Sequence, residues 1–419
     1  MTVTLDEGDR ARLAGEEGEA LRLATRIVVK MAELAGADRL IEVTSAHVDG
    51  GLYHGRAGLD FAERLVAGGG QVAVPTTLNV GSLDLLHPEL YRGDPETAGR
   101  ARRLMDCYQT MGCRPTWTCA PYQLPDRPSF GEQIAWAESN AIVFANSVLG
   151  ARTNRYGDFL DICAALTGRV PDAGLHRTEL RGGQVLFPLT GIPERLMAVD
   201  VFYPVLGHLV GRAAGSLIPV LEGLPPAVTE DQLKALGAAA ASSGAVALVH
   251  VVGVTPEAPT LDEALHGRPP QRTVEVSVDD LGRARRSLST SAGDRLGAVS
   301  LGTPHFSVTE FAALVPLLEE LRPQVPVYVS TGRHVLEQVR QNGWLGPIER
   351  AGVQVVVDTC TYVTPIIQPL QDPVMTNSAK WAYYAPGNLG VEVVFGSLEE
   401  CLRSAAAGRV VLSDWPAGD

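Results

Sequence analysis

The second half of the sequence alternates apolar strands with amphipathic helices, and this pattern restricts the possible folds more than any other feature. The pattern predicts strands at 296–301, 325–329, 353–357, 391–395 and 410–412, with helices at 308–321, 333–342, 377–384 and 398–406. Strands that alternate with helices form a parallel sheet with helices on both faces. We therefore predict an α/β fold for this half of the chain.

The first half predicts a further α/β region. A helix is expected at 6–36, a strand at 39–43, a helix at 61–67 and a strand at 71–74. Each of these two strands runs into a loop rich in hydroxyl groups. Because 419 residues exceed one simple core, we expect several lobes. Their predicted bounds are 1–215 for an N-terminal α/β lobe, 216–296 for a small middle lobe, and 297–419 for a C-terminal α/β lobe.

Composition and charge limit the classes of partner. The net charge of -13 argues against nucleic acid or an anionic membrane as the main partner. Residues 235–254 lack charged groups apart from His250, but they are mostly Ala, Gly and Ser. They predict a helix end followed by a buried strand, not a membrane span. The acidic start shows no export signal, so we expect a cytoplasmic protein with reduced thiols.

Motifs for nucleotide binding are missing from the sequence. It contains neither a Walker-type loop nor a Gly-x-Gly-x-x-Gly loop after a strand. Gly68-Gly69-Gly70 precedes an expected strand, so it predicts a turn. We therefore expect no nucleotide cofactor.

The segment from Thr116 to Arg155 has a composition typical of neither a surface nor a core. Its polar side chains are short, are uncharged, or carry the planar guanidinium of arginine, and apolar residues separate them. Such a composition suits the wall of a cavity for a small anionic molecule. The C-terminal strands also end in polar residues, at 302–305, 330–333 and 358–361. Ligands of open α/β sheets bind at these carboxyl ends.

Two of the polar groups have simpler interpretations. Ser330 and Thr331 are candidates to bind a carboxylate at the start of a helix, or to cap that helix. Ser378 and Lys380 are candidates to contact one substrate, or to be a cap followed by a solvated lysine. Both alternatives remain open on the sequence alone.

Several of these segments together resemble the large, catalytic part of the aconitase X family, over nearly the whole chain and in the same order. The matching segments are Thr44–Gly50, Leu52–Gly55, Val74–Val80, Thr118–Tyr122, Ala135–Ser139, Asn146–Arg155, Gly302–His305, Asp358–Cys360 and Thr376–Lys380. The resemblance implies a hydro-lyase that dehydrates a small carboxylic acid, such as cis-3-hydroxy-L-proline or mevalonate 5-phosphate. It also implies an aconitase-like architecture of several lobes with parallel or mixed sheets.

The resemblance also implies a partner and a metal. The family carries a small swivelling domain either fused or as a separate subunit, and this chain looks too short to contain it. A separate small subunit, and so a hetero-oligomer, is therefore implied. The family holds an iron–sulfur cluster or iron on cysteines, and Cys119 and Cys360 match two of these ligands. Thr303 stands where a third cysteine is expected, and a hydroxyl is a poor substitute for a thiolate.

The candidate site residues fall into three groups. Catalytic candidates, for proton transfer or for charge stabilisation, are Glu138, His305, Ser378 and Lys380. Substrate-binding candidates are Ser45, His47, Thr76, Thr77, Asn79, Tyr122, Asn146, Ser147, Arg152, Thr153, Asn154, Arg155, Ser330 and Thr331. Metal candidates are Cys119 and Cys360, with Thr303 at the third position. We assign Cys107, Cys113, Cys163 and Cys401 to packing or to the surface.

Two alternatives remain beside the iron-dependent hydro-lyase. With Thr303 in the motif, the site is also compatible with metal-independent acid–base isomerisation or elimination on a specialised metabolite. A third hypothesis, from another class, is a non-catalytic subunit that binds a metabolite or a partner chain.

Overall fold

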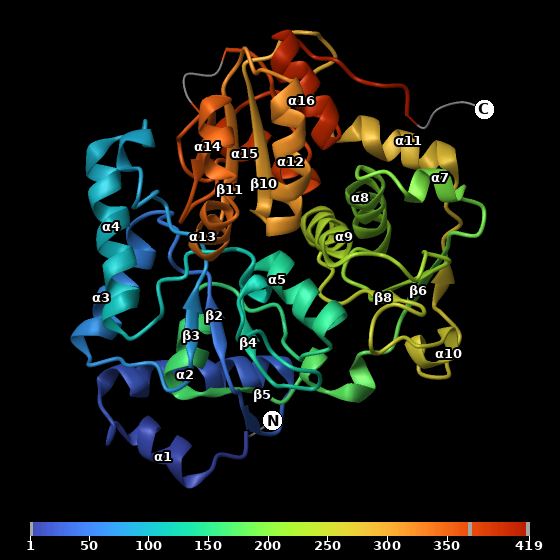
Figure 1. Ribbon diagram of the computed structural model, residues 1–419. Coiled ribbons are helices and arrows are strands. Elements are labelled where there is room, and N and C mark those ends of the chain that lie inside the picture. Colours follow the sequence, from blue (N-terminus) through green and yellow to red (C-terminus); the bar gives the residue numbers. More distant parts are fainter. Residues whose placement is uncertain (1–2, 368–370, 416–419) are drawn as a thin grey trace. The chain divides into compact units, whose positions relative to one another are not determined.

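The computed structural model describes residues 3–367 and 371–415, and the chain divides into two compact units. Unit 1 comprises Met1–Leu83 and Asp94–Gly182, and unit 2 comprises Asp84–Gly93 and Gly183–Asp419. Figure 1 follows the chain through both units from blue to red. The predicted lobe boundaries at 215 and 296 stay a prediction.

Unit 1 combines helices with two small sheets. Its helices are α1 (Glu7–Ala14), α2 (Glu19–Ala35), α3 (Arg56–Ala67), α4 (Pro95–Thr110), α5 (Ser139–Phe144) and α6 (Leu160–Thr167). Its strands are β1 (Leu40–Glu42), β2 (Ala46–Val48), β3 (Thr76–Leu78), β4 (Ala135–Trp136) and β5 (Arg169–Pro171). Strands β3, β2 and β4 form a parallel sheet in that order, while β1 pairs with β5 in the antiparallel sense.

Two of the elements predicted for unit 1 are wrong. The single helix expected at 6–36 is two helices, because Gly15 and Gly18 adopt positive φ angles of 87° and 100° between them. Such angles end a right-handed helix and suit glycine. The strand expected at 71–74 is also absent, because residues 76–78 pair with β2 instead. Thr76 and Thr77 therefore lie within a strand and not in the loop that follows one.

Unit 2 contains a larger set of alternating elements. Its helices are α7 (Glu194–Met197), α8 (Phe202–Ala214), α9 (Glu230–Ser243), α10 (Leu261–Ala264), α11 (Val278–Ser287), α12 (Val308–Glu320), α13 (Arg333–Gln341), α14 (Leu345–Arg350), α15 (Ala379–Leu389) and α16 (Leu398–Ala407). Its strands are β6 (Val185–Pro188), β7 (Pro219–Glu222), β8 (His250–Val251), β9 (Arg272–Thr273), β10 (Ala298–Phe306), β11 (Val327–Thr331), β12 (Val353–Val356), β13 (Val374–Thr376) and β14 (Val393–Phe395).

The strands of unit 2 form two parallel sheets. One has the order β8-β7-β6-β9, and the other has the order β12-β11-β10-β13-β14. Helix α12 contacts α13, α14 and α16, whereas α15 contacts β10, β13 and β14 (Figure 1). A core rich in Val, Leu, Ile and Phe side chains lies between the sheet and helices α12, α13, α14 and α16. The predicted α/β fold with parallel and mixed sheets is therefore confirmed.

Two further predictions for unit 2 have different outcomes. The strand expected at 410–412 is wrong, because these residues join no sheet; the preceding residue, Arg409, makes an isolated bridge with Arg295. The segment 235–254 forms the end of α9 and the short strand β8, as predicted. Among the described residues, helices long and apolar enough to cross a membrane are absent.

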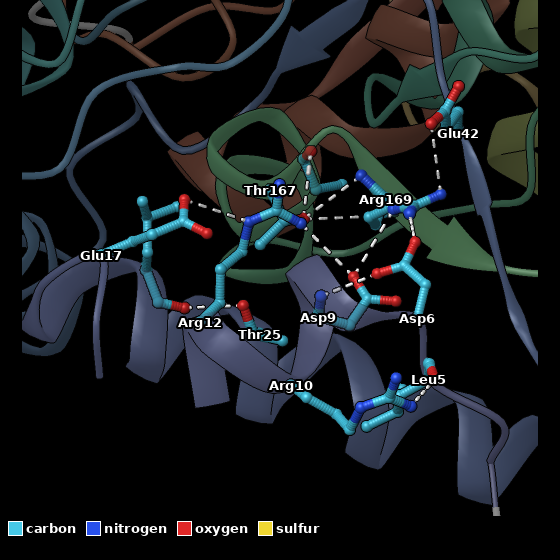
Figure 2. A network of polar contacts seen from close by, with 12 residues as sticks. Leu5, Asp6, Asp9, Arg10, Arg12, Glu17, Thr25, Glu42, Thr167 and Arg169 are labelled. Atoms are coloured by element: carbon cyan, nitrogen blue, oxygen red, sulfur yellow. Dashed lines mark hydrogen bonds and ion pairs between the residues drawn. The ribbon is translucent and has the colours of Figure 1, made fainter. Parts of the chain in front are cut away.

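A charged network fastens the start of unit 1 to its antiparallel sheet (Figure 2). The Arg169 guanidinium on β5 contacts Asp6, lies 3.5 Å from Asp9 and lies 3.5 Å from Glu42 on β1. The Asp9 side chain is only 3% exposed, and its second cationic partner is Arg12 at 3.3 Å. A buried carboxylate is tolerated only when charged or polar partners replace water. Arg169 therefore links α1 to the sheet through charge.

We expect Arg169→Met to destabilise unit 1 by about 2 kcal/mol, because Asp9 then keeps only Arg12 as a cationic partner. The matched control is Arg39→Met, which removes a 65% exposed guanidinium from its ion pair with Asp172. This surface pair is worth ~0.5 kcal/mol. Urea denaturation followed by circular dichroism measures both changes. Equal stability of the two variants would contradict a structural role of the Arg169 network.

Candidate active site

Unit 1 brings three polar side chains to the carboxyl edge of its parallel sheet. Asp49 follows β2, Asn79 follows β3, and Glu138 lies two residues after β4. The Asn79 amide donates hydrogen bonds to Asp49 Oδ1 and, at 3.2 Å, to Glu138 Oε2. Asn79 thereby bridges two carboxyl groups. Its own oxygen Oδ1 is buried and finds no hydrogen-bond partner among the described residues.

Glu138 accepts hydrogen bonds on both carboxyl oxygens. Its Oε1 accepts from the Asn140 backbone N–H at 2.9 Å, from the Asn140 amide at 2.7 Å and from Ser139 Oγ at 3.0 Å. The side chain is buried, and it caps the start of α5. A carboxyl group that accepts on both oxygens has the pattern of the ionised form. The geometry therefore suits Glu138 as a proton acceptor.

Asp49 has the opposite electrostatic environment. Burial raises its pKa well above the ordinary value, and the charges of Glu138, Asp158 and Asp161 raise it further. The hydrogen bond from Asn79 lowers the pKa but does not cancel these effects. Burial also raises the pKa of Asp161 to about 7, and its Oδ2 accepts from the Asp49 N–H at 2.7 Å. A carboxyl group with a raised pKa suits the role of proton donor.

His47 lies on β2 beside this pair and is neutral at physiological pH. Burial lowers the pKa of its imidazole to about 3, although the charge of Glu138 acts in the opposite direction. Its Nδ1 lies 2.7 Å from Thr77 Oγ1, and its Nε2 is buried with no hydrogen-bond partner in the part of the chain that the structure describes. Like Asn79, His47 offers a polar atom that the protein does not satisfy.

The structure separates some of the predicted substrate-binding residues of unit 1. Ser45 and Thr76 lie at the amino ends of β2 and β3, opposite to Asn79. Together with Thr77, they line a separate cavity of about 610 Å³ that also contains Arg114 and Glu132. These side chains therefore do not gather around the Asp49–Glu138 pair.

Much of the polar run from 146 to 155 holds the main chain in place. Asn146 exchanges hydrogen bonds with the backbone of Thr153, at 2.9 and 3.0 Å. Asn154 binds the backbone of Ala173 and Leu175 at 2.9 and 2.8 Å. These side chains satisfy loops of unit 1 itself. Three further contacts lie within unit 1 as well. Thr153 Oγ1 accepts from Trp136 N, and Arg152 donates to the His176 carbonyl and to the Thr178 hydroxyl.

The substrate-binding roles predicted for these residues, and for Ser147 and Arg155, stay predictions. Asn140, which we did not predict, connects more of the site than they do. It accepts from Tyr122 Oη at 2.7 Å and donates to the Cys119 carbonyl at 3.0 Å, besides its bonds to Glu138. Asn140 thereby fixes Tyr122 and the backbone of Cys119 relative to the carboxylate.

Unit 2 collects its predicted site residues at the carboxyl edge of the five-stranded sheet. The segment from Thr303 to His305 lies in the last part of β10, Ser330 and Thr331 end β11, and Cys360 follows β12. Thr331 Oγ1 donates to the Phe306 carbonyl at 2.8 Å, and so it does not cap α13. The buried hydroxyls of Thr303 and Ser330 have no hydrogen-bond partner among the described residues.

Ser378 and Lys380 lie beside this edge at the start of α15. Ser378 Oγ donates to the Thr303 carbonyl and accepts from Trp381 N at 3.0 Å, so the predicted capping role is confirmed. Lys380 is buried, and its ammonium lies 6.0 Å from the centre of the Tyr362 ring. Both residues, together with Thr303, line a cavity of about 280 Å³.

His305 and Cys360 form a pair of possible metal ligands within unit 2. A ring nitrogen of His305 and Sγ of Cys360 lie within 4.8 Å of each other, and both side chains are buried. The His305 ring is oriented by Nε2, which lies 3.2 Å from the Thr359 carbonyl. Such a pairing of imidazole with a backbone carbonyl fixes a ring for ligation or proton transfer. Cys401, by contrast, lies in the hydrophobic core.

Comparisons with known proteins agree with this arrangement. Models of the aconitase X first, second and third domains match residues 2–179, 185–286 and 296–407. A cis-3-hydroxy-L-proline dehydratase of Pseudomonas aeruginosa is 47% identical over 412 residues, which are 97% of this chain and 70% of that protein. A phosphomevalonate dehydratase large subunit of Methanosarcina mazei is 36% identical over 400 residues, which are 95% of this chain and 96% of that protein.

A solved structure extends the likeness to three dimensions. The crystal structure of Thermococcus kodakaraensis aconitase X in its holo form matches with a TM-score of 0.87 and 33% sequence identity. The match covers 96% of this chain and 100% of that chain. The relatives are named as dehydratases, which confirms the prediction of a hydro-lyase over that of a non-catalytic subunit. On these grounds, the chain belongs to the aconitase X family.

Proposed function

We propose that this enzyme dehydrates cis-3-hydroxy-L-proline. The chemical class rests on one observation above all, the Asp49 and Glu138 carboxyl groups bridged by the Asn79 amide. The choice of substrate is supported by the 47% identity to a cis-3-hydroxy-L-proline dehydratase, against 36% to a phosphomevalonate dehydratase large subunit. The six free cysteines suit a reducing compartment, and this supports a cytoplasmic location in the proposal.

In the proposed reaction, the two carboxyl groups have separate roles. Glu138 takes the proton from C2 of the substrate, and the electron pair of the broken C–H bond forms a C2–C3 double bond. The C3–O bond breaks, and the hydroxyl leaves as water with the proton of Asp49. The raised pKa keeps Asp49 protonated until this step. Asn79 holds both groups in place throughout.

Negative charge develops on the substrate carboxylate when the C2 proton leaves. We propose that Lys380 stabilises this charge and that Ser378 and Thr303 orient the carboxylate, since all three line one cavity of unit 2. A buried ammonium acts strongly on such charge because little water screens it. Ser330, with its unsatisfied hydroxyl, is a further binding residue in this proposal.

We also propose that His305 and Cys360 hold a single metal ion, iron by the family resemblance. The metal role predicted for Cys119 stays a prediction. Imidazole and thiolate are donors that suit iron or zinc. A cluster on three thiolates fits the chain less well, because Thr303 has a neutral hydroxyl and Cys401 lies in the core. When bound, such an ion polarises a substrate oxygen.

A second chain completes the enzyme in this proposal. The archaeal relatives of Methanosarcina mazei and Methanothermobacter thermautotrophicus are named as large subunits. These names support a small subunit with the swivelling domain as the partner. Assays of activity therefore use the complex with that subunit.

The complex is expected to release water from cis-3-hydroxy-L-proline and to leave mevalonate 5-phosphate unchanged, because the chain is 47% identical to a cis-3-hydroxy-L-proline dehydratase and 36% identical to a phosphomevalonate dehydratase large subunit. Mass spectrometry of the product mixtures measures both reactions. Turnover of the phosphate alone would contradict the proposed substrate.

Replacing a proposed metal ligand is expected to remove the metal. Cys360→Ala and His305→Ala should each lower the bound iron per chain by about tenfold or more, as weakened ligand sets do. Elemental analysis after anaerobic purification measures this without an assay of activity. The matched control is Cys401→Ala, a buried thiol in the hydrophobic core of the same unit. An unchanged amount of bound iron per chain in both ligand variants would contradict the proposed metal site.

The proposed proton donor predicts a specific dependence of kcat on pH. Asp49 donates only while it is protonated, so kcat should fall as the pH rises through the raised pKa of this group. Asp49→Asn should lower kcat by about a hundredfold and abolish this alkaline decline. Asp60→Asn removes an exposed carboxylate and serves as control. An alkaline decline that persists in Asp49→Asn would assign the proton donor elsewhere.

A further inference from the structure

Lysine is used sparingly and in unusual places in this chain. The sequence contains only three lysines, although Lys and Arg together number 35. Lys30 is 70% exposed, as is usual for a lysine. Lys234 and Lys380 are instead 3% and 2% exposed, and both line the cavity of about 280 Å³ in unit 2. Lys380 belongs to the proposed reaction, whereas Lys234 has no assigned role.

The Lys234 ammonium contacts two carboxylates and one backbone carbonyl. It contacts Glu310 on α12, lies 2.9 Å from Asp231 Oδ1 on its own helix α9, and donates to the His305 carbonyl at 3.4 Å. Burial lowers the pKa of Lys234, but the charges of Glu310 and Asp231 outweigh this effect and raise it above its ordinary value. The ammonium therefore stays charged.

The carboxylates of Asp231 and Glu310 also bind Ser307, the residue that follows β10. Ser307 Oγ donates to Asp231 Oδ2 at 2.7 Å, and Ser307 N donates to Glu310 Oε2 at 2.8 Å. Ser307 is the N-cap of α12 and directly follows β10. Lys234 therefore neutralises the two groups that fix the end of β10 and, in addition, binds the backbone of that strand at His305.

The segment from Thr303 to Ser307 is thus held from two elements of unit 2. Ser378 at the start of α15 binds the Thr303 carbonyl, and the Lys234 network on α9 binds His305 and Ser307. A backbone with unsatisfied or repelling neighbours shifts readily, and a shift of 1 Å in a site costs about a hundredfold in rate. The two carboxylates without their cation would repel each other at this position.

We propose that Lys234 is a positioning residue of the reaction, which holds the backbone of His305 so that the imidazole keeps its place at the carboxyl edge of the sheet. This inference rests on the role of His305 in the proposed function. It differs from a purely structural role in one respect. Loss of Lys234 is expected to lower kcat in protein that remains folded, while KM stays nearly constant.

The test compares Lys234→Met with Lys234→Arg in the complex with the small subunit. In folded Lys234→Met, kcat should fall about tenfold or more with KM within about threefold of the native value, as expected when geometry at the reacting atoms is lost. Lys234→Arg keeps the charge and should retain kcat within about threefold of the native value. Lys30→Met is the matched control, because it removes an exposed ammonium. Thermal unfolding shows whether each variant is folded.

A native kcat in folded Lys234→Met would overturn the inference, and so would equal losses in Lys234→Met and Lys234→Arg. If the Lys234→Met variant does not fold, the double variant that combines Lys234→Met with Glu310→Gln is measured instead. The second substitution removes one of the two carboxylates that repel each other. His305→Ala separates this inference from the proposed function. An active His305→Ala enzyme would refute the proposed role of His305, whereas an inactive one beside a native Lys234→Met enzyme would refute only the positioning role.

Discussion

Parallel pairing of strands is the constraint on which the candidate site depends. When β2, β3 and β4 pair in parallel, the residues that follow them must reach the same edge, and so Asp49, Asn79 and Glu138 converge although they are up to 89 positions apart. The five-stranded sheet of unit 2 does the same for residues after β10, β11, β12 and β13. Antiparallel pairing would alternate the ends, and these side chains would separate. In each unit, polar side chains therefore gather at the carboxyl edge of one parallel sheet.

Both edges carry polar atoms that the protein leaves unsatisfied. Among the described residues, His47 Nε2, Asn79 Oδ1, Thr303 Oγ1 and Ser330 Oγ are buried without a hydrogen-bond partner. Leaving such an atom unpaired costs about 1–3 kcal/mol, so folding alone does not favour it. Nearby polar groups, such as Asn146 and Asn154, are satisfied by the backbone. The contrast separates groups that build the loops from groups that offer hydrogen bonds to a ligand.

The sequence was sufficient for most of the five-stranded sheet of unit 2 and for the family, but not for the details of the site. The long strand β10 and the amphipathic helices beside it have clear periodicity, so they could be predicted. Strands β3 and β4 have three and two residues, and such short strands exist only through pairing with β2. Strand β3 was expected at 71–74, which assigned Thr76 to a loop, and β4 was not predicted. Asp49 and Asn140 were missed as site residues because their roles depend on neighbours that only the fold brings together.

The burial of Lys234 is a second feature that the sequence alone does not predict. In the sequence it stands in an alanine-rich helix, where a lysine ordinarily faces solvent. Its burial follows from Asp231 one turn before it and from Glu310, which lies 76 positions away on α12. A chain that uses arginine for almost all of its positive charge retains an ammonium here, between two carboxylates and a carbonyl. The scarcity of lysine is therefore informative only in combination with the positions that retain it.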